Sequence, residues 1–125
     1  MTYSPRILLV DDEIAIQRSL GPLLQTHGYE VEMASAGSAA LKLAAEHAPD
    51  LIVLDLGLPD LDGTEVCRRI RETSKVPIII LSARGGEADK VRALDLGADD
   101  FVTKPFGPEE PVSYTHLTLP TILRV

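Results

Sequence analysis

The sequence predicts one α/β domain in which a parallel β-sheet carries helices on both faces. Short apolar runs rich in Val, Ile and Leu recur along the 125 residues, and two of them end at aspartates. Longer segments between the runs repeat their apolar residues at helical spacing. Strands that alternate with helices in this way form βαβ units. A parallel sheet covered on both faces also explains why the runs are continuously apolar.

Local patterns place each element in turn. The runs 7–10 and 51–54 predict buried strands, and Pro77 opens a third run at 78–81. Segment 30–34 alternates between polar and apolar residues, which favours a strand at the edge of the sheet. Helices are expected where apolar residues share one face and a Gly or Pro follows. In order, we expect strands at 6–10, 30–34, 51–54, 78–81 and 100–103, and helices at 13–27, 37–47, 62–71 and 87–96.

The composition narrows the classes of function. The net charge of −7 argues against direct nucleic-acid contact by this chain, because phosphate contacts need clustered Lys and Arg. The one cysteine, Cys67, cannot form an internal disulfide. Residues 1–6 lead directly into a strand rather than a signal peptide, and no apolar run approaches the length that spans a bilayer. We therefore expect a cytoplasmic protein without membrane contact.

Polar side chains stand where the predicted strands end. Asp11 and Asp12 follow the first strand, Asp55 follows the third, Ser82 the fourth and Lys104 the last. In an open α/β sheet, ligands bind in the crevice outside the carboxyl ends of the parallel strands. The sequence therefore predicts that these side chains share one crevice.

The chemistry of this set points to phosphoryl transfer. Crowded carboxylates such as Asp11, Asp12 and Asp55 repel one another, so their pKa values would rise unless a cation were present. Mg²⁺ takes one or two carboxylates and leaves positions for phosphate oxygens. One carboxylate could then attack a phosphoryl group and form an aspartyl phosphate. Ser82 and Lys104 supply a hydroxyl and a positive charge, which suit the phosphoryl oxygens.

Several motifs together define a family resemblance. They are Asp11-Asp12, Asp55 with Pro59 and Asp62-Gly63, Ser82-Ala83, and Lys104-Pro105. On these motifs, residues 6–107 resemble the receiver domain of two-component response regulators. The amino-acid sequence at 55–60, 76–84 and 93–100 is similar to that of the winged-helix OmpR/PhoB subfamily and, within it, to that of KdpE-type regulators. The resemblance implies a flavodoxin-like fold with strand order 2-1-3-4-5.

The resemblance also implies roles for individual residues. Asp55 would accept a phosphoryl group from a sensor histidine kinase. Asp12, Asp55 and the backbone carbonyl of Gly57 would hold Mg²⁺, and Asp11 would contribute through water. The chain would be no enzyme beyond catalysing its own phosphorylation and dephosphorylation.

The resemblance further implies that phosphorylation switches the output face of the domain. Lys104 would contact the phosphoryl oxygens, Ser82 would move towards them, and Phe101 would change rotamer together with Ser82. In the subfamily, phosphorylation promotes a homodimer through the fourth helix, the fifth strand and the fifth helix. We therefore expect a transcriptional regulator whose DNA contacts lie outside this chain.

Two other functions remain open at this stage. Residues 60–64 match the Asp-x-Asp-Gly-Thr signature of haloacid-dehalogenase phosphatases, which also form an aspartyl phosphate. In that family the first Asp follows a buried strand directly, whereas Pro59 here separates Asp60 from the strand that ends at Asp55. Asp62-Gly63 looks more like a helix entry. This alternative predicts phosphate-ester turnover that depends on Asp60, whereas an unphosphorylated interaction module would show no labelling at all.

The last segment departs from the receiver pattern. Pro108, Pro111 and Pro120 oppose the amphipathic fifth helix that the family has there. From Val112 onward there is no acidic residue. We therefore expect a receiver domain at 1–107 and an atypical tail at 108–125 in place of the fifth helix. The tail resembles translated adapter sequence or a frameshifted end, and it should weaken dimerisation.

Overall fold

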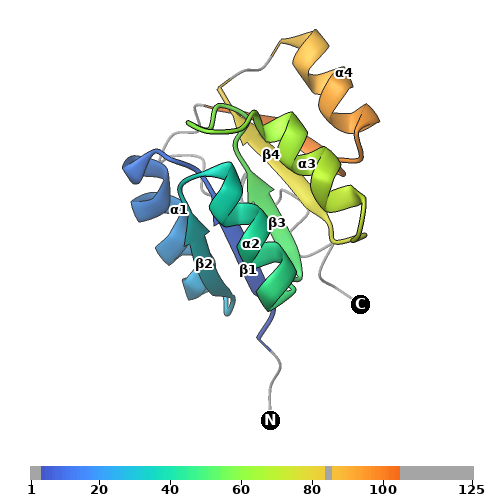
Figure 1. Cartoon of the computed structure of the whole chain (residues 1–125). Helices are drawn as coiled ribbons and strands as arrows, with labels where there is room; N and C mark the ends of the chain where they lie inside the picture. The colour runs from blue at the N-terminus through green and yellow to red at the C-terminus, as the bar shows by residue number, and fades with distance from the viewer. Residues whose placement is uncertain (1–3, 84–85, 105–125) are drawn as a thin grey trace.

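The computed structural model describes residues 4–83 and 86–104, and it confirms the predicted fold class (Figure 1). The strands are parallel and, numbered in chain order, follow the predicted flavodoxin-like order 2-1-3-4-5. Segment 30–34 lies at the edge of the sheet, as its alternating pattern predicted. In chain order the elements are β1 (Arg6–Val10), α1 (Ile14–Thr26), β2 (Glu30–Ala34), α2 (Gly37–His47), β3 (Leu51–Leu54), α3 (Gly63–Arg71), β4 (Ile78–Ser82), α4 (Glu87–Asp95) and β5 (Asp100–Thr103).

Two apolar clusters fix the helices to opposite faces of the sheet. Successive strand residues point to opposite faces, so Leu8 and Ile7 of β1 belong to different clusters. The cluster of Leu8 includes Val66 from α3, and the cluster of Ile7 includes Leu20 and Leu24 from α1. Figure 1 shows α2 and α3 side by side on the near face of the sheet. Burial on both faces explains the continuous apolar runs.

The helices and strands begin and end within one residue of the predicted positions, and local chemistry explains where they do. Glu13 is the N-cap of α1 and Asp62 the N-cap of α3, so both helices begin one residue later than expected. The Asp62 carboxylate accepts a hydrogen bond from the backbone N–H of Thr64 at 3.2 Å. Gly97 follows α4 with φ of +114°, a conformation that side chains other than glycine rarely adopt.

The carboxyl ends of β1, β3, β4 and β5 meet at one edge of the sheet. Val10 pairs with Leu54 in the β1–β3 ladder, and Ser82 pairs with Thr103 in the β4–β5 ladder. Ser82 is the last residue of β4, whereas the sequence had placed it just beyond the strand. Residues 11, 55 and 104 therefore each directly follow a strand at the same edge.

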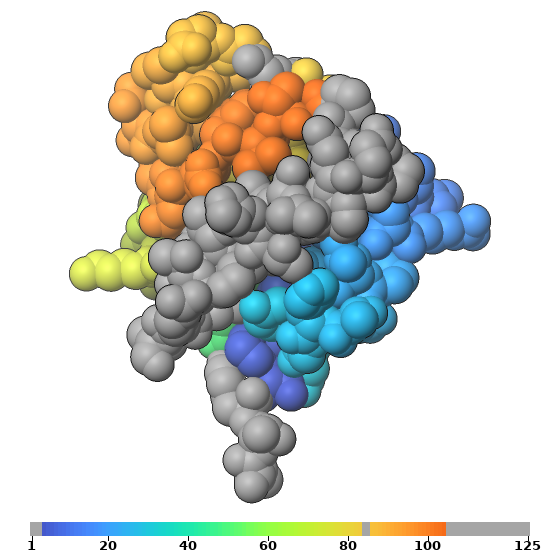
Figure 2. Space-filling view, turned by 180° about the vertical axis from the view of Figure 1, so that it is seen from behind, coloured from blue at the N-terminus to red at the C-terminus, as the bar shows by residue number. Residues whose placement is uncertain are grey.

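The remaining expectations concern the ends of the molecule. Seen from behind, α4 and β5 lie at one end of the molecule and α1 at the other (Figure 2). The atypical tail and the missing fifth helix were predicted for residues outside the described part of the chain. Among the described helices, none has the length and apolarity that crossing a bilayer requires.

Candidate functional site

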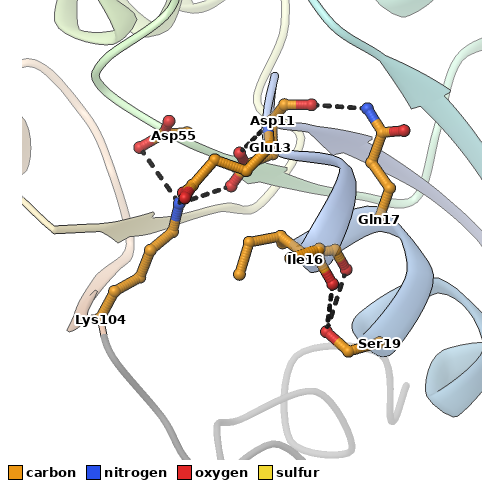
Figure 3. A network of polar contacts seen from close by, with 8 residues as sticks. Asp11, Glu13, Ile16, Gln17, Ser19, Asp55 and Lys104 are labelled. Carbon is orange, nitrogen blue, oxygen red and sulfur yellow. Dashed lines mark hydrogen bonds and ion pairs between the residues drawn. The ribbon is translucent and has the colours of Figure 1, made fainter.

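The ends of three strands bring an ammonium group and carboxylates together at the carboxyl edge of the sheet (Figure 3). The Nζ atom of Lys104, just past β5, lies 2.7 Å from Oδ2 of Asp11, just past β1. The same Nζ lies 2.6 Å from Oε1 of Glu13 and 3.8 Å from Oδ1 of Asp55. Strand ends that are far apart in the sequence thus form one charged pocket.

The carboxylates of this pocket form a compact group. Oxygens of Asp11, Asp12 and Asp55 all lie within 4.8 Å of one another. Asp11 and Asp55 are buried, whereas Asp12 is exposed to solvent. A Cβ atom added to Gly57 would lie 3.9 Å from Oδ2 of Asp55, so the backbone of Gly57 passes beside this carboxylate. Oxygen donors of this kind, open to water on one side, fit Mg²⁺.

Burial and charge set the protonation of the pocket. Burial raises the pKa of Asp11, and the charge of Asp55 adds to this rise. The hydrogen bonds from Lys104 and from the Glu13 N–H lower the pKa, but they do not cancel the rise. Burial alone would lower the pKa of Lys104, but its hydrogen bonds to Asp11 and Glu13 outweigh burial, so this pKa is raised. Lys104 is therefore a fixed positive charge, and it does not fully offset the desolvation of Asp11.

Comparison with known proteins agrees with this geometry. The family model of the response regulator receiver domain matches residues 7–115. The chain belongs to the response regulator receiver domain family. A receiver domain is a signalling domain of two-component systems rather than an enzyme in the ordinary sense.

Curated relatives of this receiver domain include a transcriptional regulatory protein and a response regulator. It is 53% identical over 104 residues to the transcriptional regulatory protein KdpE of Mycobacterium tuberculosis (strain CDC 1551 / Oshkosh), covering 83% of this chain and 46% of the relative. It is 49% identical over 106 residues to the response regulator MprA of Mycobacterium sp. (strain KMS), covering 84% and 46%. The chain thus spans about half the length of the curated relatives it matches. The resemblance to OmpR/PhoB-type regulators is confirmed.

Solved structures agree on the fold. A CheY-like receiver domain protein from Methanospirillum hungatei JF-1 superposes with a TM-score of 0.85 at 28% identity, covering 98% of each chain. A response regulator from Chloroflexus aurantiacus J-10-fl superposes with a TM-score of 0.84 at 33% identity, covering 98% of this chain and 100% of the other.

Glu13 is the residue of this receiver-domain pocket that sequence reasoning missed. Its backbone N–H donates to Oδ1 of Asp11 at 2.9 Å, and its side chain reaches Lys104. The available signal was an acid directly after Asp11-Asp12, at the start of a helix. That pattern looks like ordinary helix capping, because acids are common in the first turn.

Ser82 and Phe101 lie on the same face of the receiver domain's sheet. Phe101 pairs with Ile80, and the side chain of Ser82, two residues further along β4, points to the same side as Ile80. Both are buried, and Phe101 belongs to the cluster that includes Ala93 of α4. The two predicted switch residues are therefore diagonal neighbours next to α4.

Asp60 and Asp62 lie outside the pocket and cap helices. Oδ1 of Asp60 accepts from the backbone N–H of Gly37 at 2.7 Å, at the start of α2. Asp62 caps α3, where both the N–H and the hydroxyl of Thr64 donate to it. Neither aspartate directly follows a strand, which is the position that the phosphatase signature requires. The comparisons and this placement do not favour the phosphatase alternative.

Proposed function

We propose that this receiver domain is the phosphoacceptor switch of a two-component transcriptional regulator and that Asp55 is the acceptor. An oxygen of Asp55 attacks the phosphorus, while the bond from phosphorus to a nitrogen of a histidine on the sensor kinase breaks. The observation that carries the proposal is the pocket in which Asp11, Asp55 and Lys104 meet from three strand ends. A buried carboxylate beside a fixed ammonium group can receive a phosphoryl group whose charge the neighbours offset.

The residues of the pocket also suit the cofactor that such a reaction uses. Asp11, Asp12, Asp55 and the carbonyl of Gly57 would hold Mg²⁺, with Asp11 acting through water. Bound Mg²⁺ would neutralise the carboxylates and the phosphoryl oxygens. Burial raises the pKa of Asp11 and the nearby charge of Asp55 adds to the rise. A cation bound beside these carboxylates would favour their ionised form.

Ser82, Lys104 and Phe101 would convert phosphorylation into a change of the output face. Lys104 already lies near Oδ1 of Asp55, and a phosphoryl oxygen there would compete with Asp11 and Glu13 for its N–H groups. Ser82 would donate to a second oxygen. Its movement would change the packing of Phe101, its diagonal neighbour, and so bias α4 between two positions.

The partners follow from this switch. We infer a sensor histidine kinase as the donor and a phosphorylation-dependent homodimer through α4 and β5. Val91 and Leu94 of α4 are exposed apolar residues that such a contact would cover. The net charge of −7 suggests that this domain itself contacts no nucleic acid. From its receiver family we infer that the domain works in the cytoplasm. The atypical sequence at 108–125 would weaken the dimer relative to a chain with a regular fifth helix.

The test is labelling with a small phosphodonor in the presence of Mg²⁺. The chain should take up at most one phosphoryl group, in an acid-stable and base-labile form, and Asp55→Asn should abolish the label. Asp60→Asn should keep it at saturating Mg²⁺. Turnover of phosphate esters that depends on Asp60 would favour the phosphatase, and a label that persists in Asp55→Asn would require another acceptor. Absence of any label would favour an unphosphorylated interaction module.

A further inference from the structure

Helix α2 begins without a cap from its own part of the chain. Its N-cap residue, Ala36, has no side chain that can accept a hydrogen bond, and the first turn contains no acid. The first N–H groups of a helix have no partner within the helix and carry a partial positive charge. Here the N–H of Gly37 donates to Oδ1 of Asp60 at 2.7 Å, and the N–H of Ser38 donates to Oδ2 at 3.0 Å. An acid from a distant loop therefore caps α2.

That loop is the one that contains the proposed phosphoacceptor. Residues 55–62 connect β3 to α3, and Gly57 lies between Asp55 and Asp60. The N–H of Asp55 donates to the carbonyl of Val10 at 2.9 Å, which fixes the start of the loop. The N–H of Gly63 donates to the carbonyl of Leu56 at 2.8 Å, which fixes its end. Asp60 joins the middle of the loop to a neighbouring helix.

Packing and charge reinforce this junction. A Cβ atom added to Gly37 would lie 2.9 Å from Cβ of Leu61 and 2.9 Å from Cγ2 of Val66, so the start of α2 presses directly on the loop and on α3. The Asp60 carboxylate also accepts from the N–H of Leu61 at 2.8 Å. Hydrogen bonds from the N–H groups of Ser38 and Gly37 hold the pKa of Asp60 far below its ordinary value. The Asp60 carboxylate at this junction is thus ionised at every physiological pH, and its hydrogen bonds to the two N–H groups are charge-assisted.

We propose that Asp60 is a positioning residue that holds the carbonyl of Gly57 in place for Mg²⁺. It does so by anchoring the middle of the loop to α2, without touching the metal itself. The proposal rests on the proposed function, because it concerns the same metal site. Asp60 belongs to the segment that matches the phosphatase signature. In the receiver site it would act as an anchor for the loop and not as a nucleophile.

Calorimetric titration with Mg²⁺ tests the role of the carboxylate. For Asp60→Ala we expect the dissociation constant of Mg²⁺ to rise about threefold to tenfold. This is less than the roughly tenfold to hundredfold effect of removing a group that directly hydrogen-bonds a metal ligand, because Asp60 acts through the loop backbone. Asp60→Asn keeps one acceptor oxygen and should lie between Asp60→Ala and the unaltered chain. Amide hydrogen exchange should show faster exchange at Gly37 and Ser38 in Asp60→Ala, with or without Mg²⁺.

The matched control weakens α2 without touching the loop. Ala45 is exposed on α2, and glycine in a helix interior lowers stability. We expect Ala45→Gly to lower the melting temperature but to leave Mg²⁺ affinity unchanged. Equal Mg²⁺ affinity in Asp60→Ala and the unaltered chain would overturn the positioning role, as would an equal loss in Asp60→Ala and Ala45→Gly. If the unaltered chain itself binds no Mg²⁺, the metal site of the proposed function fails together with this role.

Discussion

At the scale of residues, the ammonium group of Lys104 holds the pocket together. Lys104 is almost fully buried and contacts Asp11 and Glu13, with Asp55 slightly further away. Removing one partner of a buried ion pair is strongly destabilising because it leaves the other charge without compensation. Lys104 therefore contributes to folding as well as to the proposed chemistry.

This dual role predicts the effect of Lys104→Met. The variant should lose about 3 kcal/mol of unfolding free energy in EDTA, because Asp11 and Asp55 would remain buried without their cation. Urea denaturation measures the loss. Lys104→Arg keeps the charge and serves as the control, with a smaller expected loss. If Lys104→Met were as stable as the unaltered chain, the pocket would not depend on this charge.

The raised pKa of Asp11 predicts a dependence of stability on pH. Because the folded state binds this proton more tightly than the unfolded state, stability falls as pH rises from the unfolded pKa of about 3.9 through the raised folded pKa. Asp11→Asn removes this decline. The difference in unfolding free energy between Asp11→Asn and the unaltered chain, in EDTA, should therefore increase in favour of the variant over that range. A constant difference would contradict the direction of the shift.

At the scale of elements, the loop after β3 is shaped by a close approach at the start of α3. A Cβ atom on Gly63 would overlap the carbonyl oxygen of Asp55 and the backbone of Leu56. Gly63 also donates its N–H to Leu56, so the first turn of α3 packs against the residue that follows β3. Glycine is required here for space, since no positive φ is involved.

Gly63→Ala should therefore damage both stability and the site. Overpacking of this kind costs about 1–3 kcal/mol, and the displaced loop should slow labelling of Asp55. Gly86→Ala is the control, because a Cβ atom there meets nothing within 4 Å. Gly86 is the N-cap of α4, so this control should lose about 0.5 kcal/mol through weaker capping alone. Thermal or urea unfolding and the labelling rate provide the two measurements. Equal behaviour of the two variants would argue against the close approach.

For the whole molecule, metal binding and folding should be linked. A ligand that binds only the folded state stabilises it, by about 2.7 kcal/mol at one hundred times its dissociation constant. Mg²⁺ should raise the melting temperature of this domain accordingly, and EDTA should reverse the rise. Asp12→Asn should leave the melting temperature in EDTA nearly unchanged, because Asp12 is exposed, and should reduce the rise with Mg²⁺. A full rise in Asp12→Asn would remove this residue from the metal site.

The sequence by itself determined the sheet, its helices and the edge at which polar residues collect. This was possible because strand burial and helix periodicity are local patterns, and because parallel strands all present their carboxyl ends on one side. Element ends shifted by one residue, since Glu13 and Asp62 could be read equally well as caps or as first helical residues.

Only the tertiary structure decided which distant groups touch. Glu13 reaches Lys104 across 91 residues of sequence, and Asp60 caps α2 across 23. Neither contact has a local pattern, because each depends on how separate loops and helices pack around the sheet. The same acids looked like ordinary capping and turn residues in the sequence. Their partners emerged only when packing brought the loops together.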